Sequence, residues 1–302
     1  MNNTNTPGKI ISKILTPFLV YYIITFLAET IFMTALMAQH PEILRMSNYD
    51  EMLNAAAELA INYRYEMLLI ASAAVFPVMN RMLREEKLKE LAAGTYVRYE
   101  KPDPLSYINV AVLGVAGGVF LNCLIHISGI YTLLDGEEIT AATAQIWDGK
   151  IFFELLGVGI LSAAVEEITF RGLILHRFES FVDTRWALLG SSFIFSLAHG
   201  SSLQGIYAFA IGMLAGLMYL RFRTVLAPFI LHMSANIVSV LQNETHFLDN
   251  FAASDTGMGL ICMASAAAFM VYFYLIISGV DVKPIDADAQ KNQSNYVNRT
   301  MP

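Results

Sequence analysis

The stretch Glu166-Glu167-Ile168-Thr169-Phe170-Arg171 decides how this sequence folds and where it works. It places three ionisable side chains within 151–174, a segment that is otherwise mostly apolar and long enough to span a membrane. A charged group in the bilayer core costs a few kcal/mol or more, so ionisable residues there indicate a functional site. The segment around Glu166 is therefore predicted to be a transmembrane helix that carries part of such a site.

Two more polar motifs follow, each within a separate apolar segment. His199 comes four residues after Phe195, and His232 comes four residues before Asn236. Residues four apart lie on the same face of a helix. Together with the carboxylates and the arginine, these side chains predict a buried hydrolytic site assembled from three hydrophobic segments.

The distribution of charge indicates the class of protein. Only 15% of the residues are charged and 56% are hydrophobic, and two long runs, Leu105–Leu134 and Thr256–Val280, contain no charged residue. A helix needs roughly 20 apolar residues to cross a bilayer. The chain is therefore predicted to be an all-α, polytopic membrane protein. No basic cluster with interleaved aromatic residues is present, so nucleic-acid binding is not expected.

About eight transmembrane helices are expected. They are predicted at 14–37, 67–82, 107–131, 151–174, 186–199, 204–220, 225–242 and 257–279. The second and fifth are short for full spans.

These helices divide the chain into four regions. Residues 1–150 form an N-terminal membrane region with three spans and a polar stretch at 39–64, which is either an amphipathic interfacial helix or a plain solvated one. Residues 151–245 form the predicted catalytic core and 246–280 the last span. The polar residues 281–302 are predicted to be a disordered cytosolic tail.

Lysine and arginine predict the orientation in the membrane. With eight spans and the N-terminus inside, the outer segments contain only Arg45, Arg64 and Lys150, and Arg171 lies in the membrane. The other fifteen of the nineteen basic residues then lie on the cytosolic side. Because cytosolic loops of membrane proteins are enriched in Lys and Arg, both termini are predicted to be cytosolic.

Helical spacing predicts different roles for the two adjacent glutamates. Glu167 and Arg171 are four residues apart and can form an ion pair, whereas Glu166 points about 100° away. Glu166 is then free to accept and release a proton, as a general acid/base requires. The alternative is that all three residues only hold helices together, which is a stronger possibility for the Glu167–Arg171 pair than for Glu166.

The histidines and the asparagine have two possible uses. His199 can share a water molecule with Glu166, and His232 and Asn236 can donate hydrogen bonds to an oxyanion. Alternatively, Glu166, His199 and His232 supply three ligands to zinc, with water in the open fourth position. Because no established zinc motif accompanies these residues, we expect a site without a metal or other cofactor.

Three further features stand outside this scheme. Gly212 and Gly216 form a Gly-x-x-x-Gly pattern, which is typical of close packing between membrane helices. Glu29 in the first predicted helix and Glu154 in the fourth are acidic residues without an assigned role.

The three motifs resemble those of a known family. Glu-Glu-x-x-x-Arg at 166–171, Phe-x-x-x-His at 195–199 and His-x-x-x-Asn at 232–236 occur in the order and spacing of the CPBP family, the type II CAAX prenyl endopeptidases and bacteriocin-processing proteases. Arg171-Gly172 and His199-Gly200 are also similar to that family. The resemblance covers about residues 150–245.

The resemblance implies an intramembrane endopeptidase of the hydrolase class. In such an enzyme Glu166 and His199 would activate water, and His232 and Asn236 would stabilise the oxyanion. Members have been described both as metalloproteases and as glutamate-dependent proteases. The implied partners are membrane lipids and a peptide, prenylated or otherwise lipidated substrate, and we expect a bacterial or archaeal cytoplasmic membrane. The alternatives are a non-catalytic scaffold or bacteriocin-immunity protein and a proton-coupled transporter.

Overall fold

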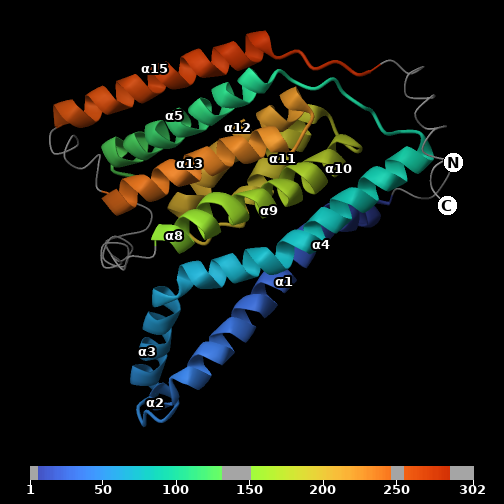
Figure 1. The fold of residues 1–302 in the computed structure, drawn as a ribbon. Helices are drawn as coiled ribbons and strands as arrows, with labels where there is room; N and C mark the ends of the chain where they lie inside the picture. The colour runs from blue at the N-terminus through green and yellow to red at the C-terminus, as the bar shows by residue number, and fades with distance from the viewer. Residues whose placement is uncertain (1–5, 131–150, 246–254, 286–302) are drawn as a thin grey trace.

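The computed structural model describes residues 6–130, 151–245 and 255–285 of the chain (Figure 1). Within these ranges the chain forms helices joined by short connections and contains no β-sheet, which confirms the all-α prediction. The elements are α1 (Pro7–Gln39), α2 (Pro41–Leu44), α3 (Tyr49–Asn62), α4 (Arg64–Ala93), α5 (Pro104–Ser128), α8 (Ile151–Glu154), η1 (Leu155–Ser162), α9 (Ala163–Glu167), η2 (Ile168–Leu175), α10 (His176–Glu179), α11 (Thr184–Leu197), α12 (Ser202–Phe222), α13 (Leu226–Thr245) and α15 (Asp255–Gly279).

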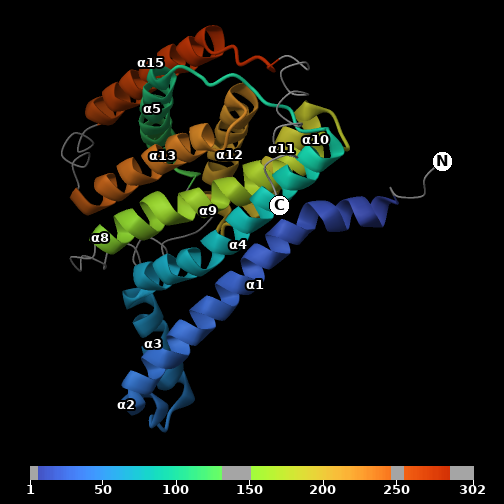
Figure 2. The same ribbon diagram turned by 45° about the vertical axis from the view of Figure 1, so that its right-hand side comes forward.

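The helices form one bundle (Figures 1 and 2). α5 and α15 pack together at one edge, and α1 and α4 pack together at the other. α13 packs on α5, and the run from α8 to α10 lies between α13 and α4. α11 packs on α12 and on η2. The segment with the two glutamates therefore lies in the interior of the bundle, with helices on several sides.

Every predicted helix is present, but the helices differ in length. In the described part of the chain, five are long and apolar enough to cross a membrane, namely α1, α4, α5, α12 and α15, and Leu226–Gln242 of α13 is a shorter apolar helix. The protein is thus a multi-pass membrane protein in which five full-length helices accompany shorter ones. The expected total of about eight spans stays a prediction beyond these five helices.

α4 extends eleven residues beyond the predicted end at position 82. The added residues, 83–93, are charged or strongly helix-forming and include neither glycine nor proline, so nothing stops the helix there. It ends at Gly94, whose φ of 70° lies in the left-handed region that glycine adopts readily. The connection predicted after residue 82 is therefore helical for most of its length.

The run from Ile151 to Glu179 is one continuous helix with two wider stretches. η1 and η2 each have eight residues in π-helical form, and α9, with Glu166 and Glu167, lies between them. π-helical turns are rare and occur often at functional sites. η2 is buried along its whole length, so the helix carrying the glutamates is surrounded by protein rather than lipid at this point.

Close contact between α5 and α13 depends on glycine. A Cβ atom at Gly114 would lie 2.3 Å from the carbonyl oxygen of Leu231, and one at Gly118 would lie 3.3 Å from the backbone of Ala235. These residues have the Gly-x-x-x-Gly spacing that lets membrane helices approach closely. Since Leu231 and Ala235 flank His232 on α13, this packing positions one of the predicted site residues.

The polar stretch at 39–64 is helical, as α2 and α3. Its apolar residues Ile43 and Leu59 form a small buried cluster with Leu36 of α1. The two helices connect the ends of α1 and α4 and project from the bundle (Figure 1). Their position at a membrane interface stays a prediction.

The first residues of the predicted tail are ordered. The amide of Glu100 donates to the carbonyl of Lys283, and the amide of Ile285 donates to the carbonyl of Arg98. Tyr99 and Pro284 form an isolated antiparallel bridge. Residues 283–285 are therefore held against the segment 98–100, and residues 286–302 lie outside the described part of the chain.

Candidate active site

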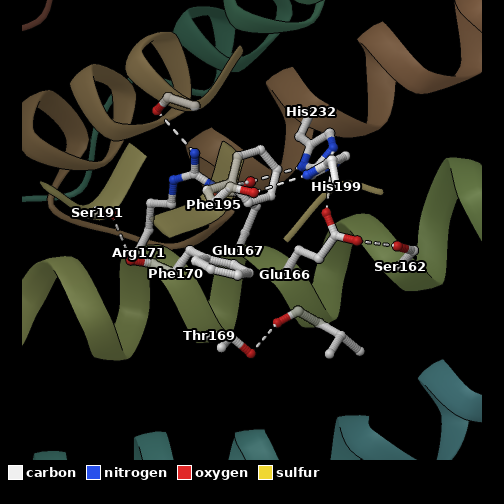
Figure 3. Close-up of polar contacts among 12 residues, drawn as sticks. Ser162, Glu166, Glu167, Thr169, Phe170, Arg171, Ser191, Phe195, His199 and His232 are labelled. Atoms are coloured by element: carbon white, nitrogen blue, oxygen red, sulfur yellow. Dashed lines mark hydrogen bonds and ion pairs between the residues drawn. The ribbon is translucent and has the colours of Figure 1, made fainter. Parts of the chain in front are cut away.

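The three polar motifs meet in the interior of the bundle (Figure 3). Glu166, Glu167 and Arg171 come from α9 and η2, His199 lies just beyond the end of α11, and His232 lies on α13. The aromatic ring of Phe195 contacts both imidazoles, with centroid distances of 4.8 Å to His199 and 5.6 Å to His232. Segments separated by more than sixty residues therefore supply one cluster.

Glu167 and Arg171 form the ion pair that their spacing predicts. Arg171 Nη1 donates to Glu167 Oε1 at 2.7 Å, and both side chains are completely buried. Arg171 Nη2 donates to the carbonyl oxygen of Gly212 at 2.9 Å, and the guanidinium lies over the ring of Phe195 at 4.5 Å. Buried charges in proteins are paired or hydrogen-bonded in this way because their desolvation is costly.

His232 is hydrogen-bonded to the same carboxylate. Its Nδ1 lies 2.8 Å from Glu167 Oε1, and since a carboxylate only accepts hydrogen bonds, Nδ1 carries the proton. The opposite nitrogen, Nε2, is 3.8 Å from Glu166 Oε2. A chain of contacts thus runs from Arg171 through Glu167 and His232 towards Glu166 (Figure 3).

Glu166 has a different environment from its neighbour. Ser162, one turn earlier, donates from Oγ to Glu166 Oε1 at 2.5 Å, and the side chain of Glu166 is 14% exposed where that of Glu167 is 0% exposed. Arg171 pairs with Glu167 and not with Glu166. Of two adjacent carboxylates, only Glu166 is therefore accessible and without a direct cationic partner.

His199 and Asn236 are each held by a backbone carbonyl. His199 Nδ1 donates to the carbonyl of Phe195 at 2.9 Å, which leaves Nε2 to accept a hydrogen bond in the neutral ring. Asn236 Nδ2 donates to the carbonyl of Val158 at 2.9 Å, and one amide N–H remains for another partner. Both side chains are thus oriented and keep a free hydrogen-bonding group.

The comparisons with known proteins agree with this arrangement. Residues 148–238 match the family Type II CAAX prenyl endopeptidase Rce1-like. The chain carries an Rce1-like domain. The domain match covers 91 of the 302 residues and contains all three motifs, which confirms the family predicted from them. The comparisons with curated proteins and with solved structures give no match.

The match to this family supports an intramembrane protease in general terms. The CAAX protease family acts on prenylated or membrane-associated peptide substrates. The helices from α1 to α5 and α15 lie outside the matched residues, and α1, α4 and α5 pack directly on the Rce1-like domain.

A cavity of ≈ 680 Å³ opens onto the motif residues of the Rce1-like domain. Its lining includes Glu166, His199, His232 and Asn236. A larger cavity of ≈ 1080 Å³ lies elsewhere, against the segment 95–104, and none of the motif residues lines it. We therefore place the candidate active site at the smaller cavity.

α1 supplies residues to this cavity that the motifs could not reveal. They are Tyr21, Tyr22, Thr25, Phe26 and Glu29. They lie far from the Rce1-like domain in the sequence, and no family motif includes them. The one available signal was Glu29, an acidic residue in an apolar span, which is a functional-site hypothesis by itself.

Two of the predicted pairs have further contacts. The polar neighbours of Glu166 are Ser162 and His232, and the ring of Phe195 contacts the imidazoles of both His199 and His232. His232 and Asn236 share a helical face but use different acceptors. The reason is that polar groups within a membrane protein must find internal partners, and those partners lie on other helices.

The zinc alternative requires three convergent ligands. Both histidines hold their Nδ1 in a hydrogen bond and leave Nε2 available, which is typical of metal-ligating imidazoles. In the described residues, however, no group of three or more His, Cys, Asp or Glu side chains is arranged to hold a metal ion. Glu166, His199 and His232 as they lie here do not form such a set.

Proposed function

We propose that the Rce1-like domain hydrolyses a peptide bond of a membrane-associated peptide or lipidated protein, with Glu166 as the general base. One observation carries this proposal: Glu166 faces the cavity, whereas the adjacent Glu167 is fully buried and neutralised by Arg171. Two titratable groups in contrasting environments are typical of acid/base assignments in active sites. Glu167 and Arg171 then serve as positioning residues.

In the proposed reaction a water molecule donates one hydrogen bond to Glu166 and one to Nε2 of His199. Glu166 takes the proton, and the oxygen attacks the carbonyl carbon of the scissile bond. The oxyanion accepts hydrogen bonds from the second amide N–H of Asn236 and from Nε2–H of His232 in its protonated form. Glu166 then passes its proton to the leaving nitrogen as the C–N bond breaks.

The position of His232 supports its share in this scheme. Its Nδ1–H is held by Glu167, which stabilises a positive charge on the ring when Nε2 is protonated. A preorganised donor of this kind stabilises charge that develops in the transition state at little reorganisation cost. The role of Arg171 is to hold Glu167 in place for this contact.

We further propose that the reaction needs no metal and that it occurs in a bacterial or archaeal cytoplasmic membrane with both termini in the cytosol. A carboxylate and two oriented imidazoles suffice for general-base catalysis. Their separate hydrogen-bond partners support distinct roles rather than equivalent ligand positions.

The proposal is tested with the purified full-length protein in detergent. Its probes are a pool of apolar quenched-fluorescence peptides and a farnesylated peptide, with products mapped by mass spectrometry. Glu166→Gln should fold normally and abolish cleavage. Glu58→Gln, which makes the same charge change on the exposed face of α3, should cut at the wild-type rate. Cleavage by Glu166→Gln close to the wild-type rate would exclude Glu166 as the base.

A further inference from the structure

One face of α1 forms a wall of the active-site cavity. Tyr22, Thr25, Phe26 and Glu29 all line it, and their spacing of three, four and seven residues places them along one stripe of the helix. α1 lies outside the matched Rce1-like residues. This wall is therefore a feature of the chain that the family motifs do not describe.

The N-terminal end of this stripe is held next to His199 by a hydrogen bond. The hydroxyl of Tyr22 donates to the carbonyl oxygen of Ala198 at 2.9 Å, and Ala198 directly precedes His199. Glu29 lies seven residues further along α1, which is roughly 10 Å at 1.5 Å per residue. An extended peptide rises about 3.3 Å per residue. Along the cavity, the carboxylate of Glu29 therefore lies about three peptide residues from the level of His199.

The charge of Glu29 is not balanced inside the protein. Among the described residues Glu29 has no hydrogen bond and no ion pair, and it is only partly buried. The phenol of Tyr21 interacts electrostatically with both Glu29 and Glu166. The described lining of the cavity contains no lysine or arginine, so two carboxylates face this space without a fixed cation.

We propose that Glu29 is a substrate-binding residue that selects a lysine or arginine side chain about three residues from the scissile bond. This rests on the proposed function and names the substrate class for it. A basic side chain supplies the missing counter-charge at a place where water is partly excluded and ion pairing is strong. A free C-terminal carboxylate at the same place is repelled by Glu29.

The binding test uses three apolar peptides of about 20 residues, long enough to span a bilayer. They are N-acetylated and C-amidated, which removes terminal charges, and carry a single central Lys, Gln or Glu. Their affinity is measured by fluorescence anisotropy on the catalytically silent Glu166→Gln protein in lipid nanodiscs. We expect the Lys peptide to bind about ten times more tightly than the Gln peptide, and the Glu peptide to bind least.

Variants at position 29 identify the source of that preference. In the Glu166→Gln background, Glu29→Gln should reduce the Lys preference to less than about twofold, Glu29→Lys should invert it in favour of the Glu peptide, and Glu29→Asp should retain it. Glu58→Gln should leave it unchanged. An equal Lys preference in the Glu29→Gln protein, or none in the parent protein, would overturn the assignment.

Cleavage by the protein with Glu166 intact separates this proposal from the enzymatic one. If the protein cuts the Lys peptide, the mapped bond should lie about three residues from the lysine, and a cut bond that keeps no fixed distance from a lysine moved along the peptide would contradict the geometry. If the Lys preference depends on Glu29 but no peptide is cut, Glu29 binds cations as proposed and the endopeptidase function is wrong.

Discussion

His232 Nδ1 lies 2.8 Å from the same carboxylate oxygen of Glu167 that accepts a hydrogen bond from Arg171. One buried oxygen therefore couples an imidazole on α13 to a guanidinium on η2. The second oxygen of Glu167 has no hydrogen-bond partner, so this carboxylate depends on Arg171 and His232 for its stability. From their spacing alone, Glu167 and Arg171 are expected to form a helix-stabilising ion pair. In the structure this pair also holds His232, a proposed catalytic residue, through Glu167.

Removal of Arg171 should both destabilise the protein and abolish its activity. Arg171→Ala leaves the buried charge of Glu167 without its main partner. Losing one member of a buried ion pair lowers the free energy of unfolding by about 3–5 kcal/mol. Urea unfolding in detergent micelles measures the effect. Arg81→Ala is the matched control, because Arg81 forms an exposed pair with Glu85 at the same i,i+4 spacing and its loss should leave the midpoint unchanged. Equal midpoints for the two variants would contradict the proposed dependence.

Ser162 should position Glu166. The Ser162→Ala protein loses one hydrogen bond to the proposed catalytic carboxylate, which at about 1 kcal/mol corresponds to a roughly fivefold lower kcat with an unchanged melting temperature. Ser278→Ala removes a hydroxyl that bonds to its own helix at an exposed position of α15, and it should retain full activity. Wild-type kcat in Ser162→Ala would show that the contact has no catalytic role.

Activity should survive the removal of metal ions. Elemental analysis of active, detergent-purified protein should give less than about a tenth of an equivalent of zinc, and prolonged chelation should leave the rate unchanged. In the proposed scheme His232→Ala removes one oxyanion donor, which typically lowers the rate about 10²–10³-fold and leaves measurable cleavage. Stoichiometric zinc, with activity lost on chelation and restored by adding the metal back, would replace this scheme with the Glu166, His199 and His232 ligand set.

Contact between α5 and α13 should not tolerate a methyl group at Gly114. A Cβ there would lie 2.3 Å from the carbonyl oxygen of Leu231, so Gly114→Ala forces the two backbones apart at a cost of about 1–3 kcal/mol. Because Leu231 precedes His232, the rate of cleavage should fall as well. Gly259→Ala is the control, since no atom lies within 4 Å of the added methyl group and the melting temperature should hold or rise. A shift of the same size in both variants would argue against close helix packing at Gly114.

The distribution of basic residues predicts which loops face the cytosol. In a background without Cys123 and Cys262, Ser47→Cys before α3 should react with a membrane-impermeant thiol reagent added to intact cells, and Thr95→Cys after α4 should react only after lysis. Both positions are exposed in the structure, so accessibility is matched. Labelling of position 95 in intact cells would reverse the orientation.

Several properties of this protein follow from the sequence alone because they depend on distances along the chain. Long uncharged runs predict membrane helices whatever their neighbours are, and the i,i+4 spacing of Glu167 and Arg171 predicts their ion pair because the helical period is constant. The order and spacing of the three motifs likewise predicted the Rce1-like domain that the family comparison confirms.

Other properties were decided by how the helices pack. The contact of Glu167 with His232 joins residues 65 positions apart, and the carbonyl of Gly212 that accepts from Arg171 lies on yet another helix. Nothing in a local pattern specifies which face of one helix meets which face of another. That choice is made by side-chain shape, by glycines such as Gly114 that allow close approach, and by the need of every buried polar group for an internal partner. For the same reason, only the packing of α1 could place Glu29 in the wall of the candidate active-site cavity.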